Sequence, residues 1–258
     1  MARIVVLSLG LLGLTGCASL YNYDYVAVGA DYWAPELNGE VDAGDLLVTG
    51  NVDVQDDLDI GDEEIVNVHG AVQIWNFTLD ASYFNVDYSG DNVLSQNIKF
   101  GDQTFTVGTN VNTDFEMQYA SAKRKAGLLA LGPVVIGALV GVNYFDLEGE
   151  VNTVLPVISA EENLEAPFPV IGAVVTADIP LGDTFAVFGD VELSGLYVDA
   201  YDIEGLFYDA SAKVGLQASL FRVGGGYRFM QGDLEDTDED FQWDFDLGGP
   251  FVFAEIAF

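Results

Sequence analysis

Apolar and polar residues alternate with a period of two along most of the chain. Between Val111 and Tyr119 every second position is apolar or a threonine, and the positions between them carry Asn, Asp, Glu and Gln. Residues 185–194 and 209–218 repeat this alternation. Successive side chains of a β-strand point to opposite faces, so the pattern predicts strands with one apolar face and one polar face.

Most of the segments that carry this pattern are longer than the strands of soluble proteins. Soluble strands typically run about 5 to 6 residues, whereas a tilted strand that crosses a bilayer needs about 9 to 11. No stretch after residue 20 is apolar for long enough to be a transmembrane helix. The sequence therefore predicts an all-β fold, an antiparallel up-and-down transmembrane β-barrel of about ten strands, with a range of eight to twelve. The predicted strands are 23–33, 64–75, 77–88, 111–126, 132–147, 167–180, 183–197, 205–219, 221–232 and 249–258.

The connections between these strands alternate in length, which gives the predicted barrel a direction. Outer-membrane barrels have short periplasmic turns and long extracellular loops. We therefore expect both termini in the periplasm and the long connections outside the cell. The short connections lie at 76, 128–131, 181–182 and 220, and the long ones at 34–63, 89–110, 148–166, 198–204 and 233–248.

The composition adds a strong charge asymmetry to this picture. The chain carries 42 acidic residues against 8 basic ones, a formal net charge of −34. Such a chain has no basic patch that could neutralise phosphates, which excludes nucleic-acid binding. Most of the acidic residues fall in the long connections, so the outer face of the barrel is predicted to be anionic.

The first 17 residues read as a secretory signal. Arg3 precedes an apolar run that is too short to span a membrane, and small residues follow. The end of this segment, Leu14-Thr15-Gly16-Cys17, resembles the lipobox of bacterial lipoproteins, which implies lipidation of Cys17. The alternative is ordinary cleavage after Ala18. The predicted organisation is a signal peptide at 1–17 and an outer-membrane barrel domain at 18–258, and without a second cysteine there is no disulfide.

The C-terminus carries a second recognisable feature. Apolar residues stand two, four and six positions before the final Phe258. This resembles the terminal strand by which the outer-membrane assembly machinery recognises its substrates, although Phe253 replaces the glycine usual in that signal. Residues 23–258 as a whole resemble small bacterial outer-membrane β-barrel proteins as a class. The resemblance implies that outer-membrane lipid and the assembly machinery are partners, and we expect a monomer.

The polar faces of the strands predict the contents of the barrel. A barrel of about eight strands is filled by its own side chains, whereas open channels need about 16 strands. We therefore expect an ion-paired interior, and a narrow cation path is the alternative. Its predicted centre is a charge cluster of Asp190, Glu192, Lys213, Arg222 and Arg228. If the apolar faces meet lipid, the other inward residues are Asp31, Asn67, His69, Gln73, Asp80, Asp114, Glu116, Gln118, Arg124, Asp178, Gln217 and Glu255.

Candidate chemistry is sparse. His69 is the only histidine, so a histidine-based triad or dyad would have to use it, and it has no acidic neighbour in the sequence. The expectation is that the protein is not an enzyme, with an outer-membrane hydrolase left open. Two acidic groups are candidate sites for Ca²⁺ or Mg²⁺, although Phe241 and Leu247 replace the Gly and Glu that a calcium loop requires. These groups are Asp57, Asp59 and Asp62, and Asp236, Asp238 and Asp240.

Four functions remain open from the sequence. The first is a non-enzymatic outer-membrane barrel with a structural or surface-interaction role, whose acidic extracellular loops are candidates to bind divalent cations. The second is a narrow cation-selective pore, and the third is an outer-membrane enzyme. The fourth is a soluble lipocalin-like periplasmic lipoprotein.

Overall fold

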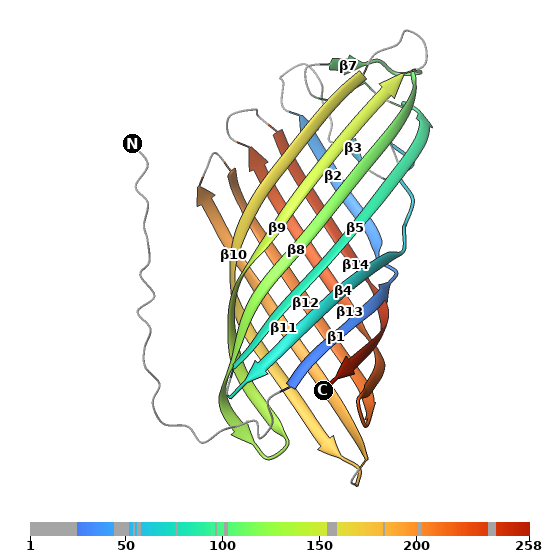
Figure 1. Ribbon diagram of the computed structural model, residues 1–258. Helices are drawn as coiled ribbons and strands as arrows, with labels where there is room; N and C mark the ends of the chain where they lie inside the picture. The colour runs from blue at the N-terminus through green and yellow to red at the C-terminus, as the bar shows by residue number, and fades with distance from the viewer. Residues whose placement is uncertain are drawn as a thin grey trace.

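The computed structural model describes residues 25–43, 52–53, 55, 58–75, 77–95, 97–100, 103–153, 159–182, 184–200, 203–236 and 241–258. Within these ranges the regular structure is entirely β (Figure 1). No helix among them is long and apolar enough to cross a membrane.

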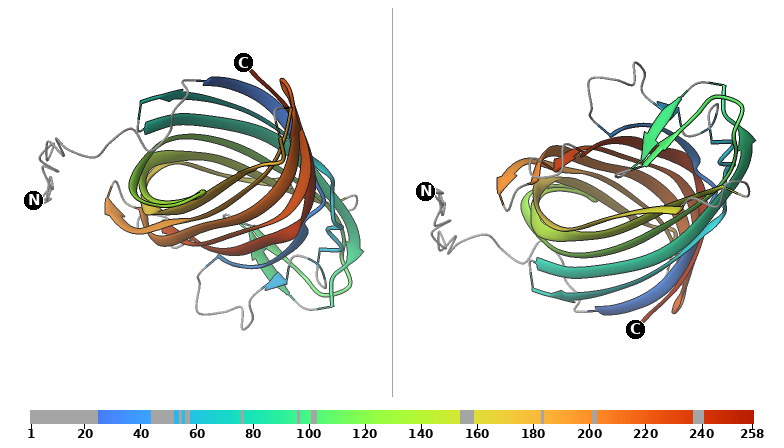
Figure 2. Two further views of the ribbon diagram at one scale, coloured as in Figure 1. Left: turned by 90° about the horizontal axis from the view of Figure 1, so that it is seen from below. Right: turned by 90° about the horizontal axis from the view of Figure 1, so that it is seen from above.

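Ten long strands form the wall of a closed antiparallel barrel, which confirms the predicted fold class. Each long strand pairs with the next one along the chain, and the last pairs with the first (Figure 2). The strands are β1 (Tyr25–Trp33), β4 (Ile65–Ile74), β5 (Phe77–Val93), β8 (Asn110–Leu131), β9 (Val134–Thr153), β10 (Ser159–Pro180), β11 (Phe185–Ala200), β12 (Ile203–Ala218), β13 (Phe221–Asp236) and β14 (Phe241–Ala257).

The wall between β14 and β4 is built from two pieces. β1 pairs with the C-terminal half of β14, from Ala27 opposite Ala257 to Trp33 opposite Phe251. After a break at residues 34–35, β2 (Glu36–Ala43) continues along the other half of β14. Two further pieces are short: β3 (Val52–Asp53), and the hairpin of β6 (Ile98–Phe100) and β7 (Gln103–Phe105). The segments 34–63 and 89–110, predicted as loops, therefore contain strands.

The two ends of the barrel differ. At one end, here called the turn end, short connections link β4 to β5, β8 to β9, β10 to β11 and β12 to β13. These tight turns need the left-handed backbone, which Gly132 and Gly182 adopt with φ of 65° and 98°. At the other end, the loop end, β9 and β10 run to Thr153 and from Ser159, well beyond the predicted limits of 147 and 167.

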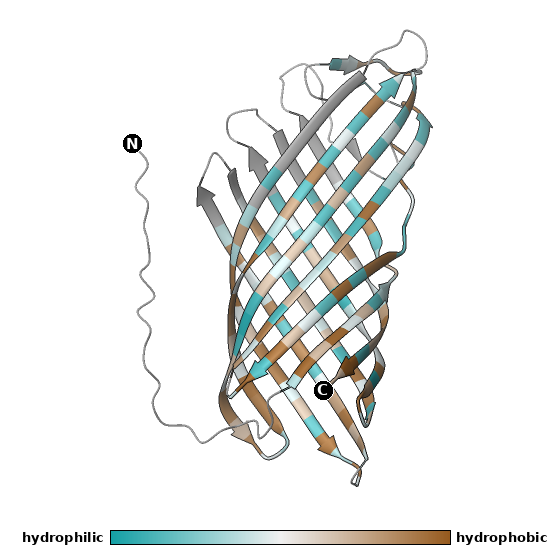
Figure 3. Ribbon diagram, in the orientation of Figure 1, coloured by the Kyte–Doolittle hydropathy of each residue, from teal (hydrophilic) through white to brown (hydrophobic). Residues whose placement is uncertain are grey.

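Toward the turn end the outer wall is an exposed apolar belt. On β9 its outward residues are Val134, Ile136, Ala138, Val140, Val142 and Tyr144. A strand rises about 3.3 Å per residue and tilts by about 45°, so this stretch covers about 23 Å of barrel height. That is close to the roughly 25 Å apolar band of transmembrane barrels. Figure 3 shows the alternation of hydropathy along each strand.

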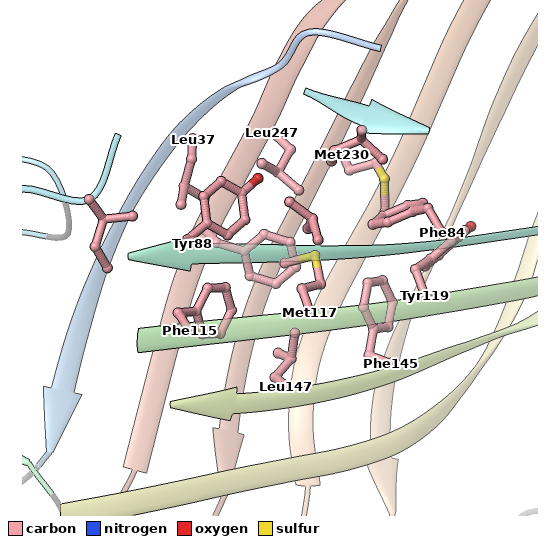
Figure 4. Packing of buried hydrophobic residues seen from close by; sticks show 14 of the residues in the cluster. Leu37, Phe84, Tyr88, Phe115, Met117, Tyr119, Phe145, Leu147, Met230 and Leu247 are labelled. Carbon is pink, nitrogen blue, oxygen red and sulfur yellow. The ribbon is translucent and has the colours of Figure 1, made fainter. Parts of the chain in front are cut away.

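Toward the loop end the two faces exchange their polarity. Phe115, Met117 and Tyr119 of β8 are buried in the barrel, while Asp114 and Glu116 between them face outward. The buried residues belong to one apolar core that fills this half of the lumen (Figure 4). Where water covers the outer wall, apolar side chains are buried only if they turn inward.

This exchange corrects part of the predicted interior. Asp114, Glu116, Gln118 and Arg124 were expected to point inward, but all four lie on the outward face of β8. The prediction assumed that the apolar face of a strand is always the outward one, which holds only within the belt. The other predicted inward residues lie at inward positions of their strands.

Candidate functional site in the lumen

The half of the lumen inside the apolar belt holds a cluster of charged side chains, here called the charged cluster. Five of the eight basic residues and the only histidine gather in it. All of them except Arg222 line a cavity of about 100 Å³, together with carboxylates from β1, β5, β11 and β12. The basic members are Lys123, Lys125, Lys213, Arg222 and Arg228, and the acidic members are Asp31, Asp80, Asp190, Glu192, Asp209 and Glu255.

Asp209 of β12 is the acceptor at the centre of this cluster. Its carboxylate accepts from Lys123 Nζ at 2.9 Å and from Arg228 Nε and Nη2 at 3.2 and 3.1 Å. The Tyr119 hydroxyl donates to it at 3.3 Å. Asp209 is 4% exposed, so this charge is stable only because several donors compensate it.

Glu192 of β11 is shared by two lysines of β8. Lys123 Nζ lies 2.7 Å from Glu192 Oε1, and Lys125 Nζ lies 2.6 Å from Glu192 Oε2. Lys125 is also 3.7 Å from Asp80 of β5. Side chains two residues apart on a strand share a face, so the two lysines reach across the lumen together. The ion pairs thereby connect β5, β8, β11 and β12.

A second group of ion pairs spans the seam where the first strand meets the last. His69 of β4 lies 3.3 Å from Asp31 of β1 through Nδ1 and 3.2 Å from Glu255 of β14 through Nε2. Glu255 also pairs with Lys213 at 3.1 Å and with Arg222 at 3.8 Å. The imidazole can reach Glu255 because Gly29, which separates them on β1, has no side chain.

We expect Gly29→Ala to destabilise this seam. A Cβ at Gly29 would lie 2.5 Å from the Ala254 carbonyl oxygen and 2.7 Å from both His69 Nε2 and Glu255 Cγ. Overpacking of this kind costs about 1–3 kcal/mol. Urea unfolding of the detergent-solubilised protein measures the loss. Gly70→Ala is the matched control, because a Cβ there would meet only the Ala27 carbonyl oxygen, at 3.6 Å. Equal stability of the two variants would contradict the packing argument.

Arg228 joins the charged cluster to the apolar core. Its guanidinium lies 5.2 Å from the ring centre of Trp33, 5.1 Å from that of Tyr119 and 5.9 Å from that of Phe84. The Trp33 indole nitrogen donates in turn to the Gly249 carbonyl oxygen at 3.1 Å. Cation–π contacts satisfy a guanidinium on the side where it meets apolar residues. One residue thus belongs to both halves of the lumen.

Aromatic rings fill the lumen on the loop-end side of the charged cluster. Phe145 of β9 contacts Phe207 of β12 with ring centres 4.9 Å apart and Phe245 of β14 with ring centres 6.2 Å apart. β9 and β14 stand on opposite sides of the ten-stranded ring. All three rings are 0% exposed. Side chains from facing walls therefore meet in the middle of this half of the barrel.

The structure brings most of the predicted charge cluster together but gives its members other partners. The prediction was that Lys213, Arg222 and Arg228 offset the charges of Asp190 and Glu192. Instead Arg228 binds Asp209, and Lys213 and Arg222 bind Glu255. Asp190 of β11 lies opposite Lys213 of β12 in the sheet register.

Sequence reasoning missed several members of the site. The sequence-based prediction gave no role to Lys123, Lys125 or Asp209. The carboxylates beside His69 come from β1 and β14, so they are remote in sequence. A usable signal existed, because Lys123 continues the every-second-residue series of Met117 and Tyr119 along the strand.

The predicted cation sites gain no support from the described residues. Asp57, Asp238 and Asp240 lie outside them, as does Cys17, and for Asp236 only the backbone is described. Asp62 accepts a hydrogen bond from the Leu37 backbone N–H at 3.1 Å, and Asp59 adopts φ of 55°. Within the part of the chain that the structure describes, no three His, Cys, Asp or Glu side chains are placed to hold a metal ion.

Comparison with known proteins identifies the fold. No protein-family model and no curated protein matches the chain. The outer-membrane protease OmpT from Escherichia coli is 10% identical, with 90% of this chain and 97% of that chain covered at a TM-score of 0.51. Ail, the attachment invasion locus protein of Yersinia pestis, is 9% identical, with 89% of this chain and 98% of that chain covered at a TM-score of 0.34. The likeness to OmpT shows that this chain has the fold of bacterial outer-membrane β-barrels, and it shows the fold alone.

Proposed function

We propose that the protein is a closed, non-conducting β-barrel of the bacterial outer membrane, with a structural or surface-interaction role and no catalytic one. The observation that carries this proposal is the filled lumen. Aromatic side chains from facing walls meet in its loop-end half, and ion pairs bridge the strands in its turn-end half. A hydrated cation that passed through the lumen would have to displace the aromatic side chains and break the ion pairs, which argues against a narrow pore.

Single-channel recording in planar lipid bilayers tests the closed lumen. We expect no conductance above background from the purified protein. Reproducible cation-selective steps would overturn the proposal in favour of the pore. A double variant, Phe145→Ala with Phe207→Ala, is the informative comparison, because it removes two rings that meet inside the loop-end half.

The apolar belt supports placement in a membrane. Valine, leucine, isoleucine and aromatic side chains are exposed on the outward faces of all ten long strands. Water cannot cover such a surface favourably, and lipid can cover it from every side. A soluble lipocalin-like protein would leave the same belt in water. Heat-modifiable migration in detergent gels and resistance to carbonate extraction are the expected results, and extraction without detergent would contradict membrane insertion.

The same barrel geometry supports an orientation. The first residue of β1 and the last of β14 lie at the turn end (Figure 1). With that end in the periplasm, a lipid on Cys17 would reach the inner leaflet close to the first strand. Labelling of intact cells with a membrane-impermeant maleimide tests this: Asp114→Cys should react and Leu181→Cys should not. The reverse result would invert the orientation.

The wall beyond the belt supports a surface role. Across β5, β8 and β9 the outward residues Asp87, Glu116 and Glu148 stand side by side in the sheet register. Like charges directly opposite each other repel. We propose that this acidic wall attracts Ca²⁺ or Mg²⁺ diffusely, as counterions, and that the acidic loops do the same.

We expect Glu148→Gln to raise the stability at low ionic strength. The substitution removes repulsion from Glu116 across the β8–β9 pair, which is worth roughly 0.2–1 kcal/mol. The gain should shrink at high salt or on addition of Mg²⁺, because both screen exposed charges. Urea unfolding at two salt concentrations measures it. Asp178→Asn, at the turn end, serves as the control; a gain from Glu148→Gln that salt does not change would contradict the electrostatic explanation.

A further inference from the structure

Arg124 is the one basic residue that faces outward among the lysines and arginines whose side chains the structure describes. It lies on β8 between Ala122 and Ala126, and its neighbours across the sheet are Leu79 of β5 and Val140 of β9. All four neighbours are apolar. Arg124 therefore sits within the belt that the proposed function places against lipid.

The Arg124 guanidinium contacts an aromatic ring but no carboxylate of the described residues. Its carbon lies 4.9 Å from the centre of the Phe77 ring. Among the described residues Arg124 makes no ion pair and no hydrogen bond. Each of the five other described basic side chains pairs with a carboxylate. Of these six basic side chains, Arg124 is therefore the one whose anionic partner would have to come from outside the protein.

Arg124 lies at a height in the belt where its side chain can reach the level of lipid headgroups. Phe77 is the first residue of β5 and follows the turn at Trp75, which is 73% exposed. Aromatic residues concentrate at the level of lipid headgroups. A long arginine side chain can extend along apolar surface and keep its charged end at that level.

We propose that Arg124 and Phe77 form a binding site for the phosphate of a phospholipid in the leaflet at the turn end. The planar guanidinium presents several N–H donors in a fork that matches phosphate oxygens, and the Phe77 ring supports its face. The acyl chains of the same lipid would lie on the apolar belt. The inference rests on the proposed membrane placement.

Native mass spectrometry of protein in maltoside detergent, titrated with phosphatidylglycerol, tests the site. We expect Arg124→Leu to bind the lipid about tenfold more weakly, as loss of a charged hydrogen-bonding group implies. Arg124→Lys should recover part of the affinity as a point charge without the fork. Unchanged binding by Arg124→Leu would overturn the inference.

Two controls separate the possible failures. Val140→Leu changes a belt residue beside Arg124 without changing charge, so it should bind like the wild type. Displacement of the lipid by equimolar inorganic phosphate would show a free-phosphate site and overturn the lipid assignment. Heat-modifiable migration of the same samples tests the barrel itself, so a folded wild type that binds no lipid refutes this site and leaves the proposed function standing.

Discussion

Asp209→Ala is expected to cost about 3–5 kcal/mol of unfolding free energy, because it leaves buried cations without their anion. Lys123 and Arg228 both donate to this carboxylate, and Lys123 is 6% exposed. Lys123 would keep Glu192 as a partner, whereas Arg228 would keep only its aromatic neighbours. The loss should therefore appear as weaker packing around Arg228 as well as lower stability.

Urea or guanidinium unfolding in detergent micelles, followed by tryptophan fluorescence, measures this loss. Asp114→Ala is the matched control, since it removes an exposed carboxylate from the outward face of β8 and should change stability by less than about 0.5 kcal/mol. If the two variants were equally stable, the ion pairs around Asp209 would contribute nothing and the charged cluster would have no structural role.

Phe145→Ala is expected to cost a similar 3–5 kcal/mol, for a different reason. The Phe145 ring is 0% exposed and lies near four other rings, those of Tyr119, Phe168, Phe207 and Phe245. Truncation removes its buried apolar surface and leaves a cavity that rings held by rigid strands cannot collapse to fill.

The same unfolding measurement checks this prediction. Phe145→Leu keeps most of the apolar volume and should lose less. The matched control is Val142→Ala, on the outward side of the same strand. A loss in Val142→Ala as large as in Phe145→Ala would show that the interior packing is not what stabilises this half of the barrel.

The two variants probe halves of the lumen that are stabilised in opposite ways. Within the belt, the proposed membrane placement covers the outward apolar side chains with lipid, and the interior is left with charges that must pair. Beyond the belt, water covers the charges outside, and the interior becomes an apolar core. Arg228 lies where the two meet, with Asp209 on one side and Trp33 on the other.

The period-two alternation by itself determined the number of long strands and their antiparallel order. It could do so because a strand exposes alternate faces whatever surrounds it. Segment length then separated a membrane barrel from a soluble sheet, and the alternation of short and long connections located the two ends. The composition revealed an excess of acid but not its position, since Glu116 was predicted to face inward and lies on the outward wall.

Only the tertiary structure decided which face of a strand is the inner one at each height. Phe115 and Val140 belong to equally regular alternations, yet Phe115 packs in the lumen and Val140 faces outward. It also decided the partners of the buried charges, since Asp209 meets Lys123 across 86 residues of sequence and His69 meets Glu255 through barrel closure. The alternation is the same whichever face is buried, and contacts across a lumen depend on closing the ring, so neither can be read from the order of residues.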